Sequence, residues 1–341
     1  MVMENLYLSQ VPDGVEDLAV VMLKNLLVNF KVENISSGFL TYKTSGNWKE
    51  VSALDCVGTS YVLLRSFILL NNVRMKVLDW CMQHPGVIMS FLQMYFSQGQ
   101  TFRVVVSCSS KEIGKYKEKI HLLEKILKGN GAKINTGHPD YEIRILEIEN
   151  IGYVGVRISG KPGDIDDLQK NSIRKDVASY MIHMSNPSSN DVFLDPMGGA
   201  GIIPLLRSKM PYKEIYVADV KTNTLLKKIK KLKLSLRDFT IIESDIVKLP
   251  SVISQPVNKL VTDPPWGYIE SMSDINRFYQ EMFKSFDKLL VKDGILVLIS
   301  PHIKLVKTCV SKSKKTFVIK DIIKIKVSGA ETYIYKIKKG L

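Results

Sequence analysis

The residues best suited to chemistry lie at positions 262–267, Thr-Asp-Pro-Pro-Trp-Gly, at the end of an apolar run that predicts a strand. Proline fixes φ and has no backbone N–H, so the carbonyl oxygens of Asp263 and Pro264 meet no competing local donors. With the Asp263 carboxylate they can accept hydrogen bonds from an amine, and Trp266 offers a flat face for stacking. The pattern predicts a catalytic site for a planar, amine-bearing base at Asp263, Pro264, Pro265 and Trp266. The alternative is a Pro-Pro turn beside a core tryptophan.

A glycine-rich turn, Asp-Pro-Met-Gly-Gly-Ala-Gly at 195–201, follows another short apolar run. Glycines let a backbone turn tightly and approach a ligand closely. A phosphate-binding P-loop is excluded because Ile202, Ile203 and Pro204 stand where a Lys-Ser/Thr pair is needed, and a dinucleotide fingerprint lacks its third glycine. The turn therefore predicts a different nucleotide-like ligand, or an ordinary connection from strand to helix.

Acidic residues end two further predicted strands. Asp219 closes Glu-Ile-Tyr-Val-Ala-Asp-Val, and Asp245 closes the next apolar run. A carboxylate at the first place can accept hydrogen bonds from ribose hydroxyls, and a polar group at the second can meet an adenine amine. Each acid alone is typical of a loop, but three acids at successive strand ends favour an adenosyl ligand.

These residues need a scaffold that brings strand ends together. The second half of the chain alternates short apolar strands with amphipathic helices, which predicts a doubly wound α/β sheet with its ligand at the carboxyl ends of the strands. Strands are expected at 191–195, 214–220, 239–246, 259–267 and 294–300, and helices at 174–185, 222–234 and 275–291.

The first half predicts an α+β unit, separated from the second by a segment rich in Gly, Pro, Asp and Ser at 159–172. The periodicity leaves 60–70 undecided between strand and helix. Helices are expected at 15–27 and 115–129, strands at 31–36, 38–43, 101–110, 141–149 and 151–159, and a turn at Glu149-Asn150.

Composition narrows the classes of protein that fit. The 341 residues carry a formal net charge of +14, which favours a polyanionic partner such as nucleic acid, although solvated lysines explain it equally well. Four scattered cysteines exclude a disulfide framework and a zinc ribbon, and the scattered histidines predict no metal site. The early acids exclude a signal peptide, and no apolar stretch is suited to cross a membrane. We therefore expect a cytoplasmic protein.

The motifs at 195–201, Asp219, Asp245 and 263–266 resemble those of Rossmann-fold S-adenosylmethionine-dependent amino-methyltransferases. Residues 102–160 resemble the THUMP RNA-binding module, and the opening segment resembles the ferredoxin-like element that precedes it. Over nearly its whole length the chain resembles the THUMP-containing tRNA guanine-N2 methyltransferases. The glycine turn departs from the family pattern at Gly198, Ala200 and Ile202, which predicts fewer side-chain contacts to the cofactor.

The resemblance implies a ferredoxin-like domain at 1–70, a THUMP domain at 71–160, a linker at 161–172 and a Rossmann-like methyltransferase domain at 173–341. It implies S-adenosylmethionine as cofactor, held by Asp195, Pro196, Met197, Gly199, Gly201, Asp219, Val220, Asp245 and Ile246. The RNA-binding residues are expected to be Arg103, Lys111, Lys115, Arg144 and Arg174.

The implied activity is methyl transfer to the exocyclic N2 of a tRNA guanosine, with acceptor-stem position 6 as the expected target. The alternatives are position 10, another RNA, or a non-catalytic RNA-binding protein with a decayed methylase fold. We expect a monomer with tRNA as partner, and the sequence leaves open whether a small activating subunit is needed.

Overall fold

The computed structural model describes residues 4–68, 71–109, 111–159, 172–267, 274–313, 316–327 and 329–340. The chain divides into two compact units, of which the first runs to Asp167 and the second from Leu168, with Pro12–Val15 grouped with the second. The linker expected at 161–172 lies outside the described residues up to position 171.

The first unit contains one mixed sheet with the strand order β2-β3-β1-β4-β8-β7-β5-β6. The segment at 60–70, which the periodicity left undecided, forms the strand β4, and this strand pairs with β1 on one side and β8 on the other. Strands from both of the expected N-terminal domains therefore share one sheet, and the boundary at residue 70 stays a prediction. The strands are β1 (Asn5–Gln10), β2 (Lys31–Ser36), β3 (Phe39–Thr44), β4 (Ser60–Ile68), β5 (Thr101–Val106), β6 (Lys133–Ile134), β7 (Tyr141–Ile148) and β8 (Ile151–Arg157).

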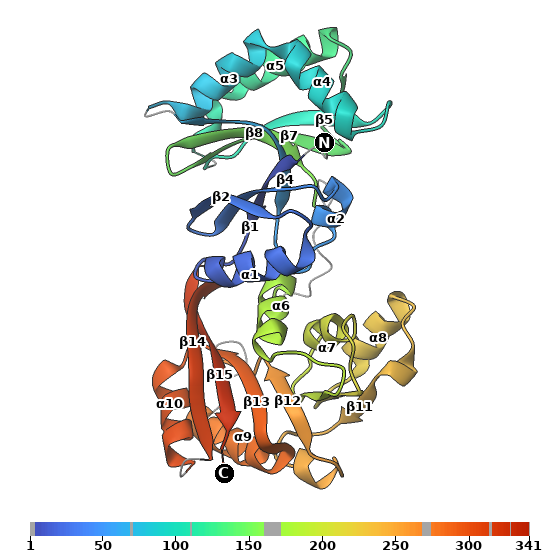
Figure 1. Ribbon diagram of the computed structural model, residues 1–341, viewed down its shortest axis with the longest axis vertical. Helices are drawn as coiled ribbons and strands as arrows, with labels where there is room; N and C mark the ends of the chain where they lie inside the picture. The colour runs from blue at the N-terminus through green and yellow to red at the C-terminus, as the bar shows by residue number, and fades with distance from the viewer. Residues whose placement is uncertain are drawn as a thin grey trace. The chain divides into compact units, whose positions relative to one another are not determined.

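Helices α3, α4 and α5 gather over the β5, β7 and β8 end of this sheet (Figure 1). The helix that was predicted to end at Gly129 is confirmed as α5. Its buried leucines recur at helical spacing, as they do in an amphipathic helix. Helices α3 and α4 were not predicted; Pro85 separates them, since proline is tolerated in the first turn of a helix but not inside it. The helices are α1 (Glu16–Leu26), α2 (Trp48–Ser52), α3 (Val73–Gln83), α4 (Pro85–Tyr95), the short 3₁₀ helix η1 (Ile113–Lys115) and α5 (Lys117–Gly129).

The turn predicted between β7 and β8 is confirmed at Glu149 and Asn150, which have φ values of 47° and 67°. Positive φ at both central residues matches the right-handed twist of a two-residue hairpin. The turn fixes the register, so that Ile148 lies opposite Ile151 and Arg144 opposite Gly155.

The second unit is the doubly wound sheet that the sequence predicts, with the strand order β11-β10-β9-β12-β13-β15-β14. The first five strands in this order are parallel, and an antiparallel hairpin that was not predicted completes the edge. The strands are β9 (Val192–Asp195), β10 (Glu214–Asp219), β11 (Thr240–Glu243), β12 (Val257–Thr262), β13 (Leu290–Ser300), β14 (Phe317–Val327) and β15 (Ala330–Lys339).

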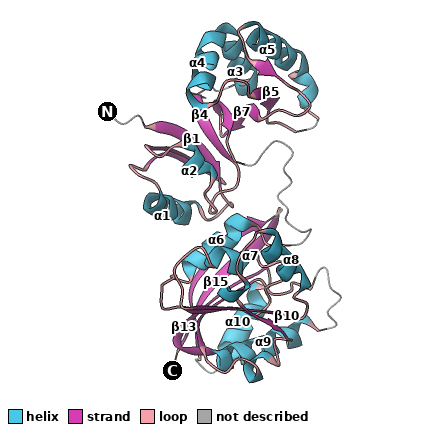
Figure 2. Cartoon of the chain, turned by 90° about the vertical axis from the view of Figure 1, so that its right-hand side faces the viewer, coloured by secondary structure: helices cyan, strands magenta, loops and turns pink. Residues whose placement is uncertain are grey.

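Helices cover both faces of this sheet, with α6, α7 and α8 on one side and α9 and α10 on the other (Figure 2). The large core under α9 contains Phe283, Phe286 and Leu260. Strand β13 begins at Leu290, whereas the sequence predicts a start at Gly294. Leu290 pairs with Val257 of β12, and the register of the two strands shifts directly after this pair. The helices are α6 (Lys175–Met184), α7 (Ile202–Arg207), α8 (Asn223–Lys231), α9 (Ile275–Leu289), α10 (Ile303–Lys312) and the 3₁₀ helices η2 (Leu236–Asp238) and η3 (Leu249–Ser251).

The order of the strands reverses between β9 and β12. The chain leaves β9 toward β10 and β11, and then returns to place β12 on the other side of β9. A crevice forms at such a switch point because the connections at the carboxyl ends diverge. The glycine turn follows β9 and the Asp-Pro-Pro-Trp segment follows β12, so the two motifs meet there.

Candidate active site

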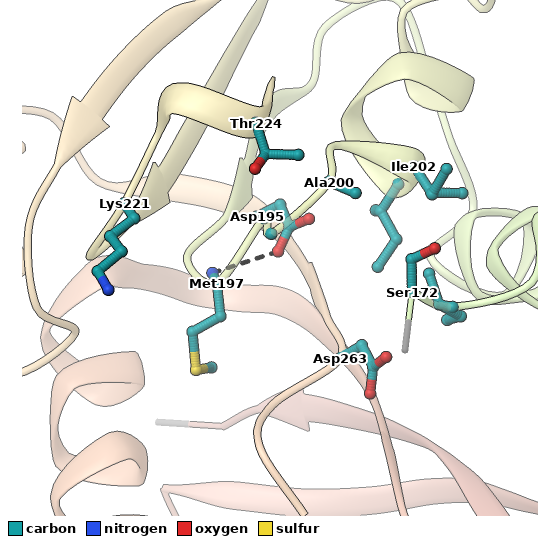
Figure 3. Close-up of a pocket in the computed structure, with 12 residues that line it drawn as sticks. Ser172, Asp195, Met197, Ala200, Ile202, Lys221, Thr224 and Asp263 are labelled. Atoms are coloured by element: carbon teal, nitrogen blue, oxygen red, sulfur yellow. Dashed lines mark hydrogen bonds between the residues drawn. The ribbon is translucent and has the colours of Figure 1, made fainter. Parts of the chain in front are cut away.

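A cavity of about 250 Å³ opens at the carboxyl ends of β9 and β12 (Figure 3). Most of its wall comes from the glycine turn, and Asp263 closes it from the end of β12. Lys221 and Thr224, near the start of α8, complete another part of the wall. Residues of both predicted motifs line this cavity, among them Asp195, Met197, Gly198, Gly199 and Asp263. Of the segment after β12 only Asp263 does so, because Pro264, Pro265 and Trp266 are not part of the lining.

The glycine turn keeps its backbone close to the neighbouring strand. The N–H of Gly198 donates to the carbonyl of Ala218 at 2.8 Å, and a Cβ at this position would lie 2.5 Å from Cγ1 of Val217. Gly201 has φ +79°, and a Cβ there would lie 2.3 Å from Cδ1 of Leu225. Gly198 therefore fits a position where a larger residue would clash.

The surroundings of Gly199 differ from those of Gly198 and Gly201. It has φ +49°, and a Cβ built on it would meet no heavy atom within 4 Å. Because this residue also lines the cavity, its open side is available to a ligand that approaches the backbone.

Asp195 is the last residue of β9, and only 1% of it is exposed. Its Oδ1 accepts a hydrogen bond from the N–H of Met197 at 3.3 Å (Figure 3). Burial raises the pKa of this carboxyl well above its usual range, and the nearby charges of Asp219 and Asp263 act in the same direction. A cation in the cavity would stabilise the ionised form of Asp195.

Asp219 ends β10 and supports the glycine turn directly. Its Oδ2 accepts from the N–H of Gly199 at 2.8 Å, and its Oδ1 accepts from the N–H of Lys221 at 3.1 Å. Each carboxylate oxygen can accept a further bond, so ribose hydroxyls could still bind. Val220, the next residue, is 60% exposed.

The residues expected to meet adenine lie further from the glycine turn in sequence and do not line the cavity. Asp245 is exposed, and its Oδ1 accepts from the N–H of Val247 at 2.7 Å. Ile246 is buried in the core of the sheet. The cavity thus gathers the acid of β9, the glycine turn and Asp263, but neither Asp219 nor the pair Asp245-Ile246.

Asp263 follows β12 directly and faces the cavity. The indole N–H of Trp266 donates to its Oδ1 at 3.0 Å. Burial raises the pKa of Asp263 to about 7, and the hydrogen bond from Trp266 opposes this rise. Trp266 is half-buried and lies outside the hydrophobic core, so the alternative of a core tryptophan is wrong.

The backbone of the same loop is held by a residue that the sequence analysis missed. Nε2 of His302 lies 2.7 Å from the carbonyl oxygen of Trp266, and because a carbonyl can only accept, the ring N–H donates. His302 follows Ser300, the last residue of β13, whose hydroxyl accepts from the backbone N–H of His302 at 3.1 Å. No sequence pattern links positions 266 and 302.

In the first unit, Arg103 and Arg144 do not stand free. Both bind Glu142, which is 1% exposed, with closest distances of 2.5 Å each. Arg157 lies 3.6 Å from the same carboxylate. Burial opposes ionisation of Glu142, but the hydrogen bonds and charges of Arg103 and Arg144 lower its pKa overall. The group of three guanidiniums and one carboxylate, the Glu142 cluster, has a net charge of +2.

The other expected RNA contacts differ in their surroundings. Lys111 and Lys115 are exposed on the segment before α5. Arg174 precedes α6 in the second unit, and its Nε donates to the buried carboxylate of Asp176 at 3.0 Å. Within the described parts of the chain, no group of acids, histidines and cysteines could hold a metal ion. None of the described helices is both long and apolar enough to cross a bilayer.

The second unit has a Rossmann-like methyltransferase fold. Residues 164–330 match the UPF0020 family model, described as an RMKL-like methyltransferase domain. No curated protein sequence matches the chain.

Solved structures match the chain over nearly its whole length. The structure of TrmN from Thermus thermophilus has a TM-score of 0.79 and 17% identity, and the match covers 99% of this chain and 100% of that one. A protein described as a possible methylase from Clostridium difficile 630 has a TM-score of 0.73 and 14% identity over 99% of both chains. SMU.472, solved in complex with SAH, has a TM-score of 0.71 and 15% identity, covering 100% and 99%. These similarities establish the fold of both units.

Proposed function

We propose that the protein is an S-adenosylmethionine-dependent methyltransferase that modifies the exocyclic N2 of a guanosine in tRNA. The observation that carries the proposal is the shared cavity of Asp263, Asp195 and the glycine turn at the switch point of the sheet. The Asp-Pro-Pro-Trp sequence supports an amine as acceptor, and the likeness to TrmN supports tRNA as substrate. Acceptor-stem position 6 is the proposed target and position 10 the alternative.

The residues around the cavity fit S-adenosylmethionine. The open side of Gly199 gives a ligand access to the backbone, and the buried Asp195 carboxylate would be stabilised by the positive charge of the cofactor. We assign Met197, which lines the cavity, to cofactor binding together with Pro196 and Gly201 of the same turn, which do not line it. Asp219, Val220, Asp245 and Ile246 are assigned to the ribose and adenine end. Bound there, the cofactor supplies a methyl group activated by a sulfonium leaving group.

Asp263 has two roles in the proposed reaction. Its carboxylate and the carbonyl of Pro264 each accept a hydrogen bond from one of the two N2–H groups. These bonds orient the nitrogen toward the methyl carbon. As the bond between N2 and the methyl carbon forms, N2 loses one proton. A carboxyl with a pKa of about 7 is well matched to accept that proton near neutral pH.

The indole N–H of Trp266 holds Oδ1 of Asp263, so Oδ2 is left for the substrate. We assign the half-buried ring of Trp266 to stack on the base that enters the loop. Pro265 removes a further backbone donor between Asp263 and Trp266, which keeps the local carbonyls available.

We assign RNA binding chiefly to the first unit, with a THUMP module at 71–160. The Glu142 cluster supports this role, because its arginines are 20–33% exposed and carry a surplus of positive charge. Guanidiniums already oriented by a carboxylate lose little entropy when they bind a phosphate. Lys111, Lys115 and Arg174 are proposed as further phosphate contacts, and the protein is proposed to act as a cytoplasmic monomer.

The test is methylation of unmodified tRNA transcripts by the purified full-length protein with S-adenosylmethionine, followed by nucleoside mass spectrometry. We expect N2-methylguanosine, and its loss from a transcript with adenosine at position 6 would locate the target. Loss only from the position 10 transcript would select the alternative. A methylated adenosine would disprove guanine N2 as the acceptor. Absence of S-adenosylmethionine binding would instead indicate an RNA-binding protein without catalysis.

A further inference from the structure

A cluster of stacked side chains lies on the first unit, apart from the Glu142 cluster. The guanidinium carbon of Arg65 is 5.2 Å from the ring centre of Phe67 and 5.1 Å from that of Trp80. The rings of Trp80 and His84 stack with their centres 4.7 Å apart and an interplanar angle of 15°. We call Arg65, Phe67, Trp80 and His84 the Trp80 stack.

A β-bulge in β4 aims Arg65 at helix α3. The register between β4 and β8 shifts between Leu63 and Arg65, after which Arg65 pairs with Val154 and Phe67 with Gly152. Residues paired in this way share a face of the sheet, and the bulge therefore puts both side chains on the face that α3 covers. Gly152 lets α3 approach, because a Cβ there would lie 2.7 Å from Val73 and from Val77.

The helical part of the stack is equally well defined. Trp80 and His84 are one turn apart, and the ring N–H at Nδ1 of His84 donates to the carbonyl of Trp80 at 2.9 Å. Lys76 is exposed one turn before Trp80, so a cation lies at the other end of the same stripe. Asp79 is ion-paired with Lys119 and does not neutralise this stripe.

Arg65 differs from the arginines of the Glu142 cluster in what it binds. Arg103 and Arg144 are held by a carboxylate, whereas the guanidinium of Arg65 has no ion pair or hydrogen bond to any residue in the described ranges and packs against two rings. Its side chain is exposed, as is that of His84. Its N–H donors are therefore presented to solvent in a fixed plane.

We propose that the Trp80 stack is a second RNA-contact site, which binds an unpaired stretch of RNA. The exposed ring of His84 extends the stack for a nucleobase, and Arg65 and Lys76 supply donors for the adjoining phosphates. A cationic surface with π-faces fits nucleobases and phosphates better than an apolar protein segment. The inference rests on the proposed function and adds a substrate subsite to it.

The two sites on the first unit contact different parts of the RNA. Arg144 pairs with Gly155 and Arg65 pairs with Val154, and neighbouring residues of β8 face opposite sides of the sheet. The Trp80 stack and the Glu142 cluster therefore lie on opposite faces. An RNA that reaches both must pass around an edge of the sheet, which an unpaired strand does more easily than a duplex.

The experiment measures binding of a labelled oligouridylate to the full-length protein by fluorescence anisotropy. Arg65→Met keeps the aliphatic stem but removes the planar cation, and His84→Ala removes the outer ring. Lys49→Met is the matched control. Lys49 also lies over a tryptophan, 5.8 Å from the ring centre of Trp48, but it is not part of the Trp80 stack. Circular dichroism and S-adenosylmethionine binding establish that each variant is folded.

We expect Arg65→Met and His84→Ala each to weaken oligouridylate binding about tenfold, with little change for Lys49→Met or for binding of an RNA duplex. Wild-type affinity in both stack variants would overturn the site while leaving the proposed function intact. Equal losses for duplex and oligouridylate would also overturn it, because the effect would then be general electrostatics. Failure of the wild-type protein to bind either oligouridylate or tRNA would overturn both this site and the proposed function.

Discussion

The indole N–H of Trp266 donates a hydrogen bond to the carboxylate of Asp263 at 3.0 Å, although the two residues are separated by two prolines. Phenylalanine at position 266 could not make this bond because its ring carries no donor, and tyrosine carries its side-chain donor at the far end of the ring instead of on an indole nitrogen. The tryptophan therefore contributes to the state of the carboxylate as well as offering a surface to a base.

Trp266→Phe removes the hydrogen bond that opposes the rise in the Asp263 pKa. The pKa should move above about 7, where it stands in the wild-type protein. Because the substrate amine needs the ionised carboxylate as acceptor, activity is lost as the pH falls through this pKa. We expect the acidic limb of kcat/KM against pH to shift to higher pH. Trp48→Phe, in the first unit, serves as control, and an unshifted limb would refute the role of the indole N–H.

Asp263→Ala should abolish methyl transfer by removing both the acceptor for N2–H and the group that takes the proton. We expect kcat to fall by about 10²–10⁴-fold, which is the usual contribution of a general base. Affinity for tRNA, measured by filter binding, should stay within a few fold, since RNA binding is assigned to other residues. A parallel collapse of tRNA binding would show that Asp263 has been given the wrong role.

Asp195→Asn should stabilise the free protein. The folded-state pKa of Asp195 lies above the value of about 3.9 in an unfolded chain. At a pH between the unfolded-state and the folded-state pKa, the folded protein binds more protons than the unfolded chain. The free energy of unfolding therefore falls as the pH rises through this range. The asparagine variant lacks this term and should unfold at higher temperature at pH 7.

The same substitution should weaken S-adenosylmethionine binding, which calorimetry can measure, because the variant cannot offer a negative charge to the cofactor. Asp245→Asn, at an exposed acid, is the control for the melting experiment. An Asp195→Asn protein that melts below the wild type would contradict the assigned cost of burying this carboxyl.

Gly201→Ala and Gly199→Ala should differ in their effect on folding. Both positions have positive φ, but only at Gly201 would a Cβ collide with a neighbour, the buried Leu225. We expect a loss of about 2 kcal/mol in the free energy of unfolding for Gly201→Ala and a smaller loss for Gly199→Ala. Urea denaturation measures both, and equal losses would show that backbone strain alone decides.

The doubly wound sheet was predictable because each parallel strand ends in a polar residue and because α8 and α9 each have a clear apolar stripe. Asp195 and Asp219 are indeed the last residues of their strands, while Asp245 follows β11 by two positions. The cavity at β9 and β12 then follows from the strand order. The C-terminal hairpin escaped prediction, although β15 contributes Tyr335 and Ile337 to the core.

Other features depend on contacts that no local pattern encodes. Glu142 and Arg157 join Arg103 and Arg144 only because β5, β7 and β8 are neighbours in a particular register. His302 reaches Trp266 from the next strand of the sheet, and Arg65 meets Trp80 through a bulge. In each case the sequence supplies suitable side chains, but the partner is chosen by strand pairing far along the chain.

Seven residue pairs join β4 to β8, from Tyr61–Arg157 to Ile68–Ile151. A chain cut near residue 70 would leave both strands with an open edge, and exposed strand edges promote association with other chains. The N-terminal 160 residues should accordingly melt in a single transition and resist separation into smaller working parts. A recombination that exchanges the first unit would leave the described strand ladders of both sheets intact if the joint lay after β8 and before α6.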